Sequence, residues 1–256
     1  MSAGEPPVVV VLGAKGQTGR RIVDRALASG FKVIATVRGS GDATAADFDF
    51  PDSSLLQVQR MDVVKNSREE LTQLLRNAGT DVAALVVATG FSPGFPPDPA
   101  GAVKVDWAGT VKAFDSAQDA GNVQRFVLVS SLLTNGLAAG EGLNPQYLLL
   151  NAFGGVLLAK NAAERYIQSR SQSGLDFTII RPGGLSNEAR AGDILFSAAD
   201  TLFGGSIERD QVAATVVAAI QSPDARNKIV EIIQSETASP LSFQEGFASV
   251  PPARRS

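Results

Sequence analysis

The chain has 256 residues, of which 44% are hydrophobic and 19% charged, and its formal net charge is −3. This length and composition suit one folded domain with a full core, and the interspersed charges exclude a basic surface for nucleic acid. Cysteine and histidine are absent, which excludes thiolate nucleophiles, disulfides, imidazole bases and zinc clusters, so we expect no metal site.

Short β-branched runs alternate with longer segments of helical periodicity along most of the chain. In chain order we expect strands at residues 8–12, 31–37, 55–59, 82–88, 125–130, 176–181 and 228–233. Between them we expect helices at about 18–29, 67–77, 101–120, 155–172 and 211–221. Such alternation is typical of a parallel sheet with helices on both faces. The predicted class is therefore α/β, with three layers and a doubly wound, mostly parallel sheet whose last strand is 228–233.

The domain organisation follows from where this alternation ends. We expect one domain over residues 1–235, including a small C-terminal portion beside the substrate. Residues 236–256 contain serine and proline and end in Arg-Arg-Ser, which predicts a loosely held tail.

A glycine motif, Gly13-Ala14-Lys15-Gly16-Gln17-Thr18-Gly19, lies between the first expected strand and the first expected helix. The first glycine permits a tight turn, the second lets the backbone approach a pyrophosphate, and the third lets the helix pack on the strand. The helix N-terminus offers unpaired N–H groups and a positive dipole end to phosphates. The motif therefore predicts a Rossmann domain whose dinucleotide cofactor is bound by these seven residues.

The spacing of the glycines resembles that of the extended and atypical short-chain dehydrogenase/reductases. An NAD enzyme places an acid about twenty residues further on, where it holds the ribose 2′-hydroxyl. Residues 31–41 contain no acid, and the second strand ends at Arg38 instead. A guanidinium there pairs with the 2′-phosphate of NADP, whereas a carboxylate would repel it. We therefore predict NADP(H) as the cofactor and prefer this role of Arg38 to that of a solvated arginine.

The resemblance extends from residue 8 to residue 233. The segments in the order of the family are 106–110 (DWAGT), 125–131 (RFVLVSS) and 181–184 (RPGG). The chain is similar to atypical NAD(P)-binding, NmrA-like members of chloroplasts and cyanobacteria, including the Rossmann part of an NADP-binding protein of the chloroplast import machinery. Segments 200–205 and 206–213 strengthen this likeness. It implies a chloroplast protein, in the stroma or at the thylakoid surface, in place of a cytoplasmic one.

The resemblance also implies roles for residues outside the glycine motif. Asp62 corresponds to the residue that accepts a hydrogen bond from the adenine amine, although an ordinary turn aspartate is an equally good interpretation. Pro182 and Gly183 are expected to pass close to the nicotinamide carboxamide. The small residues expected beside the adenosine ribose are Ala88, Thr89 and Gly90.

Catalytic members of this family use a serine and a Tyr-x-x-x-Lys pair, in which the lysine lowers the pKa of the tyrosine. Ser131 falls at the serine position and Lys160 at the lysine position, but Val156 replaces the tyrosine. Lys160 can still bind the nicotinamide ribose. Ser131 can bind a substrate carbonyl or merely satisfy backbone groups at the strand end. These two are the expected catalytic residues. Tyr147 lies nine residues before the lost tyrosine and is a disfavoured substitute.

The apolar segment 147–159 has three interpretations. We favour core packing; the others are a pocket for a large apolar substrate, such as an isoprenoid, quinone or tetrapyrrole, and a docking surface for a protein partner. The segment is shorter than the roughly 20 residues that cross a bilayer, so no transmembrane segment is expected.

Two functions fit these residues. The favoured one is an NADPH-dependent oxidoreductase, a reductase with an incomplete Tyr-Lys pair whose acceptor takes its proton from solvent. The alternative is a non-catalytic NADP(H)-binding redox sensor or assembly factor that docks on a photosynthetic or other complex. The retained Ser131 and Lys160 favour the former, and the missing tyrosine favours the latter. The identity of the substrate does not follow from the sequence.

Overall fold

The computed structural model describes residues 5–39, 44–49, 53–92, 94, 98–152, 154–170 and 174–253. The strands are β1 (Val8–Leu12), β2 (Lys32–Val37), β3 (Leu56–Arg60), β4 (Val82–Val87), β5 (Arg125–Val129), β6 (Asp176–Pro182), β7 (Gly184–Ser186), β8 (Asp193–Ala198), β9 (Ser206–Glu208) and β10 (Lys228–Ser235). The α-helices are α1 (Gln17–Ala28), α2 (Arg68–Ala78), α3 (Thr110–Ala120), α4 (Pro145–Asn151), α5 (Val156–Ser169), α6 (Arg209–Gln221) and α7 (Phe243–Ser249). Shorter turns are η1 (Ala45–Asp47), the π-helical η2 (Val103–Gly109) and η3 (Pro223–Ala225).

The strands form one sheet in the order β3-β2-β1-β4-β5-β6-β10-β9-β7, with β8 also paired to β10. Strands β1 to β6 and β10 are parallel, whereas β8 and β9 run antiparallel to β10. The chain order reverses between β1 and β4, and ligands of such sheets bind beside this point at the carboxyl ends of the strands. This is the predicted α/β architecture.

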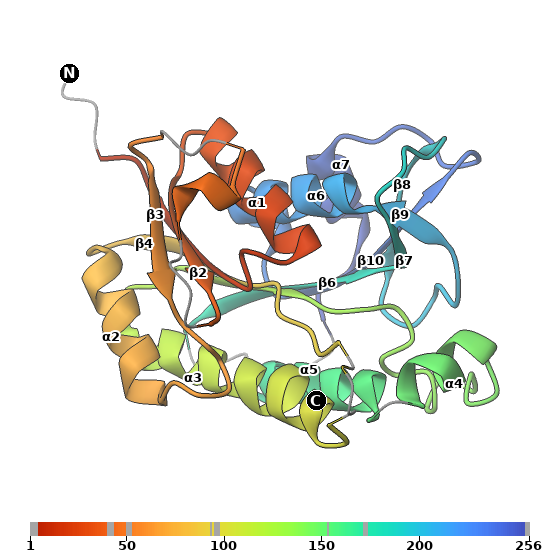
Figure 1. The fold of residues 1–256 in the computed structure, drawn as a ribbon. Coiled ribbons are helices and arrows are strands. Elements are labelled where there is room, and N and C mark those ends of the chain that lie inside the picture. The colour runs from red at the N-terminus through yellow and green to blue at the C-terminus, as the bar shows by residue number, and fades with distance from the viewer. Residues whose placement is uncertain are drawn as a thin grey trace.

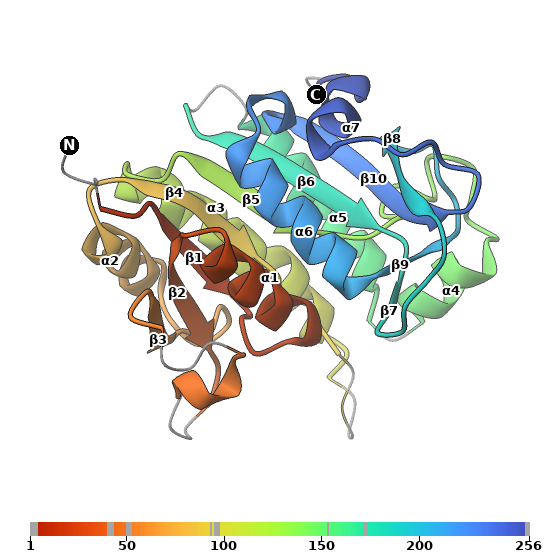
Figure 2. The same ribbon diagram turned by 90° about the horizontal axis from the view of Figure 1, so that it is seen from above.

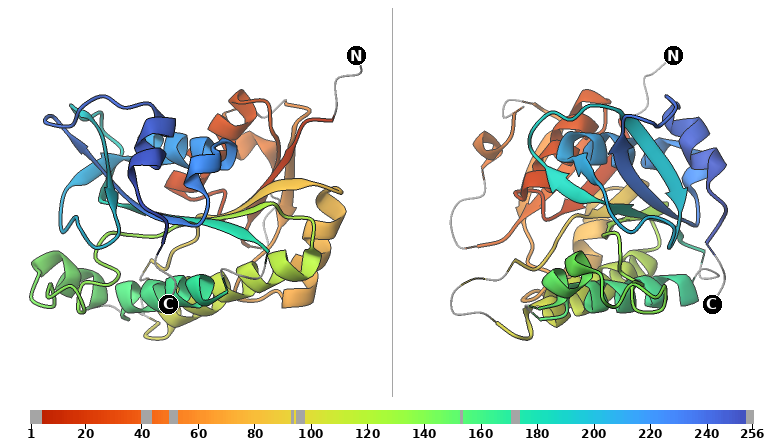
Figure 3. Two further views of the ribbon diagram at one scale, coloured as in Figure 1. Left: turned by 180° about the vertical axis from the view of Figure 1, so that it is seen from behind. Right: turned by 90° about the vertical axis from the view of Figure 1, so that its right-hand side faces the viewer.

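Helices cover both faces of the sheet (Figure 1). Helices α1, α6 and α7 form one layer, and α2, α3 and α5 form the other, with α4 at its end; Figure 2 and Figure 3 show the same layers from other sides. The all-apolar β1 reflects this arrangement. Val9 and Val11 belong to the core that contains Ile22 of α1, whereas Val10 and Leu12 belong to the core that contains Leu75 of α2. A strand with both faces buried needs a continuous apolar run.

The predicted last strand, 228–233, is not the edge of the sheet. It forms part of β10, and the strands β8 and β9 pair with its outer side. Strands β7 and β9 have three residues each, too short to show a strand pattern in the sequence. The predicted helix 101–120 also differs, because η2 occupies part of it with π-helical turns.

The tail expected to be loosely held is packed against the domain where the structure describes it. Ser242 and Glu245 form a capping box at the start of α7, and Phe247 is fully buried. Its ring meets Phe196 of β8 edge-on, with the centroids 5.6 Å apart. Aromatic burial of this size outweighs the polar composition that suggested a loose tail. Residues 254–256 of the tail lie outside the described residues.

Among the helices of the described residues, none has both the length and the apolar character needed to cross a membrane.

Candidate functional site

The glycine motif forms the turn from β1 into α1, and its three glycines meet different surroundings. Gly13 has φ +81°, and a Cβ on it would lie 2.9 Å from Ala88 O at the end of β4. A Cβ on Gly19 would lie 2.2 Å from Gly13 O, so helix and turn touch through backbone atoms. Gly16 is exposed, and a Cβ on it would meet only Gly13 O at 3.2 Å. Gly13 and Gly19 are therefore required by the fold itself, whereas Gly16 is exposed and only one backbone oxygen lies close to it.

Helix α1 begins without a side-chain cap at Gly16. The first residue of the helix, Gln17, is exposed at the carboxyl edge of the sheet. Uncapped first-turn N–H groups and the positive helix dipole are the features that bind phosphate. Ala14 is the exception within the motif, because its side chain is fully buried in the core.

A pocket of about 330 Å³ opens beside this turn. It brings together residues that follow four neighbouring strands: β1, β2, β3 and β4. Most of the residues expected at the adenosine end of the cofactor line it: Gly13, Lys15, Gly16, Arg38, Asp62, Ala88, Thr89 and Gly90. Parallel strands end at one edge, which explains how residues so distant in sequence converge.

The chemistry of this pocket fits an adenosine phosphate. Arg38 follows β2 and is exposed at the pocket wall, while Asp62 follows β3 and its Oδ1 accepts a hydrogen bond from Val64 N at 2.9 Å. Thr89 Oγ1 is buried and, among the described residues, has no hydrogen-bond partner. Buried hydroxyl groups ordinarily have a partner, so Thr89 indicates a ligand or water in the pocket. Asp62 thus shapes a turn and also lines the pocket.

The residues expected at the nicotinamide end lie outside this pocket, further along the same edge. Ser131 directly follows β5, and its neighbours are tied to the end of β6 by Ser130 N to Ile180 O at 2.7 Å and Leu132 N to Pro182 O at 3.0 Å. Ser131 is therefore held beside Pro182, as a shared site requires. Packing also requires a glycine at position 183, because a Cβ on Gly183 would lie 2.7 Å from Gly205 O.

Lys160 lies on the first turns of α5 and faces η2. Its Nζ is 2.9 Å from Asp106 Oδ1, a buried ion pair without the alignment of a hydrogen bond. Asp106 Oδ2 accepts a hydrogen bond from Phe91 N at 3.0 Å. Asp106 belongs to a motif noted in the sequence, but no role followed from it there. π-Helical turns are frequent at functional sites, and here they carry the partner of the retained lysine.

The segment 147–159 divides between core and surface, so core packing accounts for only part of it. Tyr147 and Leu157 are buried in a small cluster with Leu132 and Leu133. The tyrosine therefore serves packing, which argues against it as a substitute proton donor. Four leucines of the segment remain exposed: Leu148, Leu149, Leu150 and Leu158.

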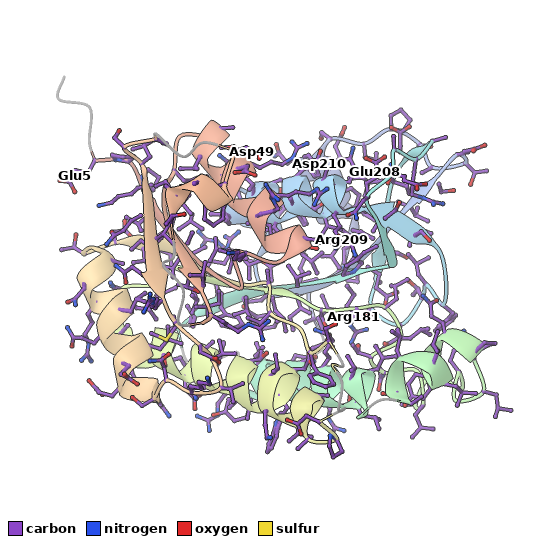
Figure 4. The ribbon with its side chains drawn as sticks, viewed as in Figure 1. Glu5, Asp49, Arg181, Glu208, Arg209 and Asp210 are labelled. Carbon is purple, nitrogen blue, oxygen red and sulfur yellow. The ribbon has the colours of Figure 1, made fainter. Side chains whose placement is uncertain are left out.

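A buried charge network lies behind the nicotinamide end, where Figure 4 shows Arg181 between the sheet and the helix layer of α5. Arg181 has 3% of its side chain exposed and pairs with Glu164 at 2.6 Å and Glu231 at 3.2 Å. Asp200 accepts a further hydrogen bond from it, at 2.8 Å. Burial by itself would lower the pKa of Arg181, but the charge of Glu164 and the hydrogen bonds of the network raise it above the ordinary value.

This network reaches the expected catalytic segment. Ser130 Oγ donates to Glu164, which lies one helical turn after Lys160 on α5. One sequence signal could have pointed to Glu164: its spacing of four residues from Lys160, which places both side chains on one face of the helix. The partners from β6 and β10 depend on strand pairing, in which Arg181 lies opposite Glu231.

Comparisons with known proteins agree with this geometry. Residues 13–223 match the model of an NAD(P)H-binding family. The chain is 45% identical to the chloroplastic protein At2g34460 of Arabidopsis thaliana, over 94% of this chain and 82% of that protein. It is 34% identical to the chloroplastic protein TIC 62 of Pisum sativum over 97% of this chain, but spans only 46% of TIC 62. These plant relatives are chloroplast proteins, which supports the expected localisation.

A solved structure shows the same fold over nearly the whole chain. The anaerobillin reductase ChuY from Escherichia coli O157:H7 superposes with a TM-score of 0.67 and 25% sequence identity. The match covers 92% of this chain and all of that one, at 100%.

Proposed function

Because the chain belongs to the NAD(P)H-binding family, we propose that it binds NADP(H) in preference to NAD(H) and acts as an NADPH-dependent reductase in the chloroplast. The observation that carries the proposal is the pocket wall at the end of β2, where Arg38 stands in place of an acid. Among the described residues that line the pocket, the one acid is Asp62, which follows β3 instead. A guanidinium at the ribose end favours the 2′-phosphate that distinguishes NADP from NAD.

Different residues of the chain would bind different parts of the cofactor. The first turn of α1 would bind the pyrophosphate, and Thr89 Oγ1 would find in the adenosine half the partner that the described residues do not supply. When bound, NADPH supplies a hydride. Lys160, held by Asp106, would hold the nicotinamide ribose, and Ser131 would orient the acceptor beside Pro182.

The proton for the reduced acceptor would come from solvent. The chain has Val156 in place of the tyrosine that donates it in catalytic relatives, and Tyr147 is buried in an apolar cluster. Acceptors such as quinones, flavins and conjugated systems take up a hydride without a dedicated acid, because the added charge is delocalised. The reductase function of the structural relative ChuY is in keeping with this proposal.

One observation favours a second function, an NADP(H)-binding redox sensor or assembly factor. Three consecutive leucines on α4, Leu148 to Leu150, are exposed beside the exposed Leu158. Exposed apolar patches commonly mark binding surfaces. The two functions share the cofactor site and differ in whether bound NADPH is oxidised by a small acceptor.

The first test is a titration of the protein with NADPH and NADH, followed by nicotinamide fluorescence. Loss of charge-assisted hydrogen bonds to the 2′-phosphate in Arg38→Ala is expected to weaken NADPH binding about 10- to 100-fold and to leave NADH unchanged. Arg226→Ala is the matched control, because Arg226 follows η3 at the amino edge of the sheet, far from the pocket. Equal affinity of the native protein for both nucleotides would overturn the NADP preference.

The second test separates reductase from sensor. NADPH oxidation is followed at 1:1 cofactor loading with a panel of quinones and flavins, in the native protein and in Lys160→Met. Turnover that depends on Lys160 supports the reductase. Tight NADPH binding without oxidation by any acceptor of the panel would favour the sensor.

A further inference from the structure

A second cavity, of about 610 Å³, lies on the α5 face of the sheet and shares no lining residue with the cofactor pocket. It is lined by one face of α5, by the turn that follows β8 and by residues 251–253, which follow α7. Ala253 packs against the core that contains Ile167 of α5, and its N–H donates to Asn227 O at 2.9 Å. Ligand sites commonly measure about 300–1,000 Å³, so the cavity has room for a small molecule.

The turn after β8 contributes a carboxylate to this cavity, that of Asp200. Its Oδ1 accepts a hydrogen bond from Arg181 Nη1 at 2.8 Å and its Oδ2 one from Asn135 Nδ2 at 3.0 Å, yet 36% of the side chain remains exposed. The N–H groups of Asp200 and Thr201 both donate to the buried Glu231, at 2.8 and 3.1 Å, which fixes the turn. The carboxylate is therefore held in place and can accept further hydrogen bonds from the cavity.

The charge of Arg181 does not neutralise this carboxylate. The same guanidinium also pairs with two buried acids, Glu164 at 2.6 Å and Glu231 at 3.2 Å. Three carboxylates thus share one cation within the part of the chain that the structure describes. A protonated amine beside Asp200 would be stabilised by this excess of negative charge.

The α5 wall carries the opposite charge. Asn161, Arg165 and Gln168 line the cavity at spacings of four and three residues, which places them on one face of the helix. Arg165 is exposed and, within the described ranges, forms no ion pair, not even with Asp200 of the same cavity. The half-buried amide of Asn161 has no hydrogen bond within these ranges either. A guanidinium and an amide without partners suit the two oxygens of a carboxylate.

We propose that this cavity binds a zwitterionic amino acid, with its ammonium group at Asp200 and its carboxylate at Arg165 and Asn161. Opposite charges that line one cavity without pairing leave room for a ligand that carries both charges. The cavity is also lined by Ile229 and by the prolines at 251 and 252, which favours an apolar side chain on the ligand. This site goes beyond the proposed reductase function and does not depend on it.

Three probes that differ only in charge test the assignment. L-Phenylalanine carries both charges, L-phenylalaninamide only the ammonium group and N-acetyl-L-phenylalanine only the carboxylate. They are titrated by calorimetry at about pH 6, where the amines are protonated. The proteins are the native chain, Arg165→Gln and Asp200→Asn. The control is Arg170→Gln, because Arg170 is an exposed arginine at the end of the same helix and does not line the cavity.

Asparagine is the mildest change at position 200, because Asp200 has φ +63° and asparagine tolerates this left-handed conformation. The amide oxygen can still accept the hydrogen bond from Arg181. Thermal unfolding confirms that each variant is folded before the probes are compared.

We expect the native protein to bind phenylalanine at least about tenfold more tightly than either blocked form. Arg165→Gln should abolish the preference over phenylalaninamide and keep the preference over N-acetylphenylalanine. Asp200→Asn should do the reverse, and Arg170→Gln should change neither preference. This crossed pattern is expected only if the two residues bind opposite ends of one ligand.

Failure of the native protein to bind phenylalanine, or equal binding of the three probes, would overturn the proposal. A preference that depends on Asp200 alone would overturn the assignment of a zwitterion and indicate a site for cations. Competition between phenylalanine and NADPH would place the probe in the cofactor pocket and refute the second site. A protein that binds phenylalanine as expected but neither NADPH nor NADH would refute only the proposed reductase function.

Discussion

Lys160 Nζ lies 2.9 Å from Asp106 Oδ1, which joins helix α5 to the π-helical η2 through one buried ion pair. The carboxylate of Asp106 is fully buried, and 13% of the lysine side chain is exposed. The ion pair thus holds the lysine side chain in a defined position. Asp106 is a positioning residue for Lys160 in the proposed cofactor site.

The pair is testable by a double-mutant cycle. Lys160→Met leaves a buried carboxylate without its cation, and we expect the free energy of unfolding to fall by about 3 kcal/mol. Asp106→Asn should cost about 1–3 kcal/mol, and the double variant less than the sum, with a coupling energy of about 1–3 kcal/mol. Urea unfolding measures all three. Additive effects would show that the two side chains do not interact in solution.

Substitutions of two glycines in the phosphate loop should have different effects, one mainly on stability and the other mainly on NADPH binding. A methyl group on Gly19 would lie 2.2 Å from Gly13 O, so Gly19→Ala is expected to lower the free energy of unfolding by about 2 kcal/mol or more. Gly16→Ala would bring its methyl group to 3.2 Å from Gly13 O alone, a tight contact with a single atom, and should change stability by about 1 kcal/mol or less. It should nevertheless weaken NADPH binding at least about tenfold, by keeping the pyrophosphate away from the backbone. Unchanged NADPH affinity in Gly16→Ala would contradict the proposed phosphate site.

The stability of the buried network should depend on Arg181, which is its one cation among the described residues. Arg181→Met leaves Glu164 and Glu231 charged and buried, and we expect a loss of about 3–5 kcal/mol in the free energy of unfolding. Arg226→Met is the control, since Arg226 forms an exposed pair with Asp176 at 3.4 Å and should contribute less than about 1 kcal/mol. Similar losses in the two variants would mean that the network adds nothing beyond a surface ion pair.

Asp24 gives a pH-dependent prediction. Burial, and then the charge of Asp49, raise its pKa above the ordinary value, although Asp49 N donates to it at 3.2 Å. The folded state therefore favours the protonated form: stability from this group is present below the unfolded pKa and is lost as the pH rises through the folded pKa. Asp24→Asn should raise the melting temperature at pH 7 by about 1–2 °C.

The same comparison near pH 3 provides the check. There the native carboxyl is protonated in both states, so the advantage of the asparagine should disappear. Glu188→Gln, a change at an exposed acid, is the control. An advantage of the same size at both pH values would assign the effect to packing.

The packing of α7 predicts a large effect from a residue near the end of the chain. Phe247→Ala removes a fully buried ring that meets Phe196, and we expect a loss of about 3–5 kcal/mol. Ser242→Ala, which removes the cap of the same helix, should cost only about 1 kcal/mol. Chemical unfolding measures both losses. A Phe247→Ala variant as stable as the native protein would support the original prediction of a loosely held tail.

Local rules were sufficient for the parallel strands β1 to β6 and for the phosphate loop. The apolar run of β1 followed at once by the glycine motif specifies a strand, a turn and a helix, because each residue acts on its immediate neighbours. The position of Arg38 beside the pocket could also be predicted, because Arg38 follows the second strand and parallel strands end at one edge of the sheet. These features need no knowledge of distant contacts.

Tertiary packing alone decided the rest. Asp106 meets Lys160, and Arg181 meets Glu231, only because separate helices and strands pack with one register. For the same reason Phe247 packs into the core although the tail around it is polar in composition. Sequence determines such a contact only through the whole fold, because the free energy that orders it comes from surfaces far apart in the chain.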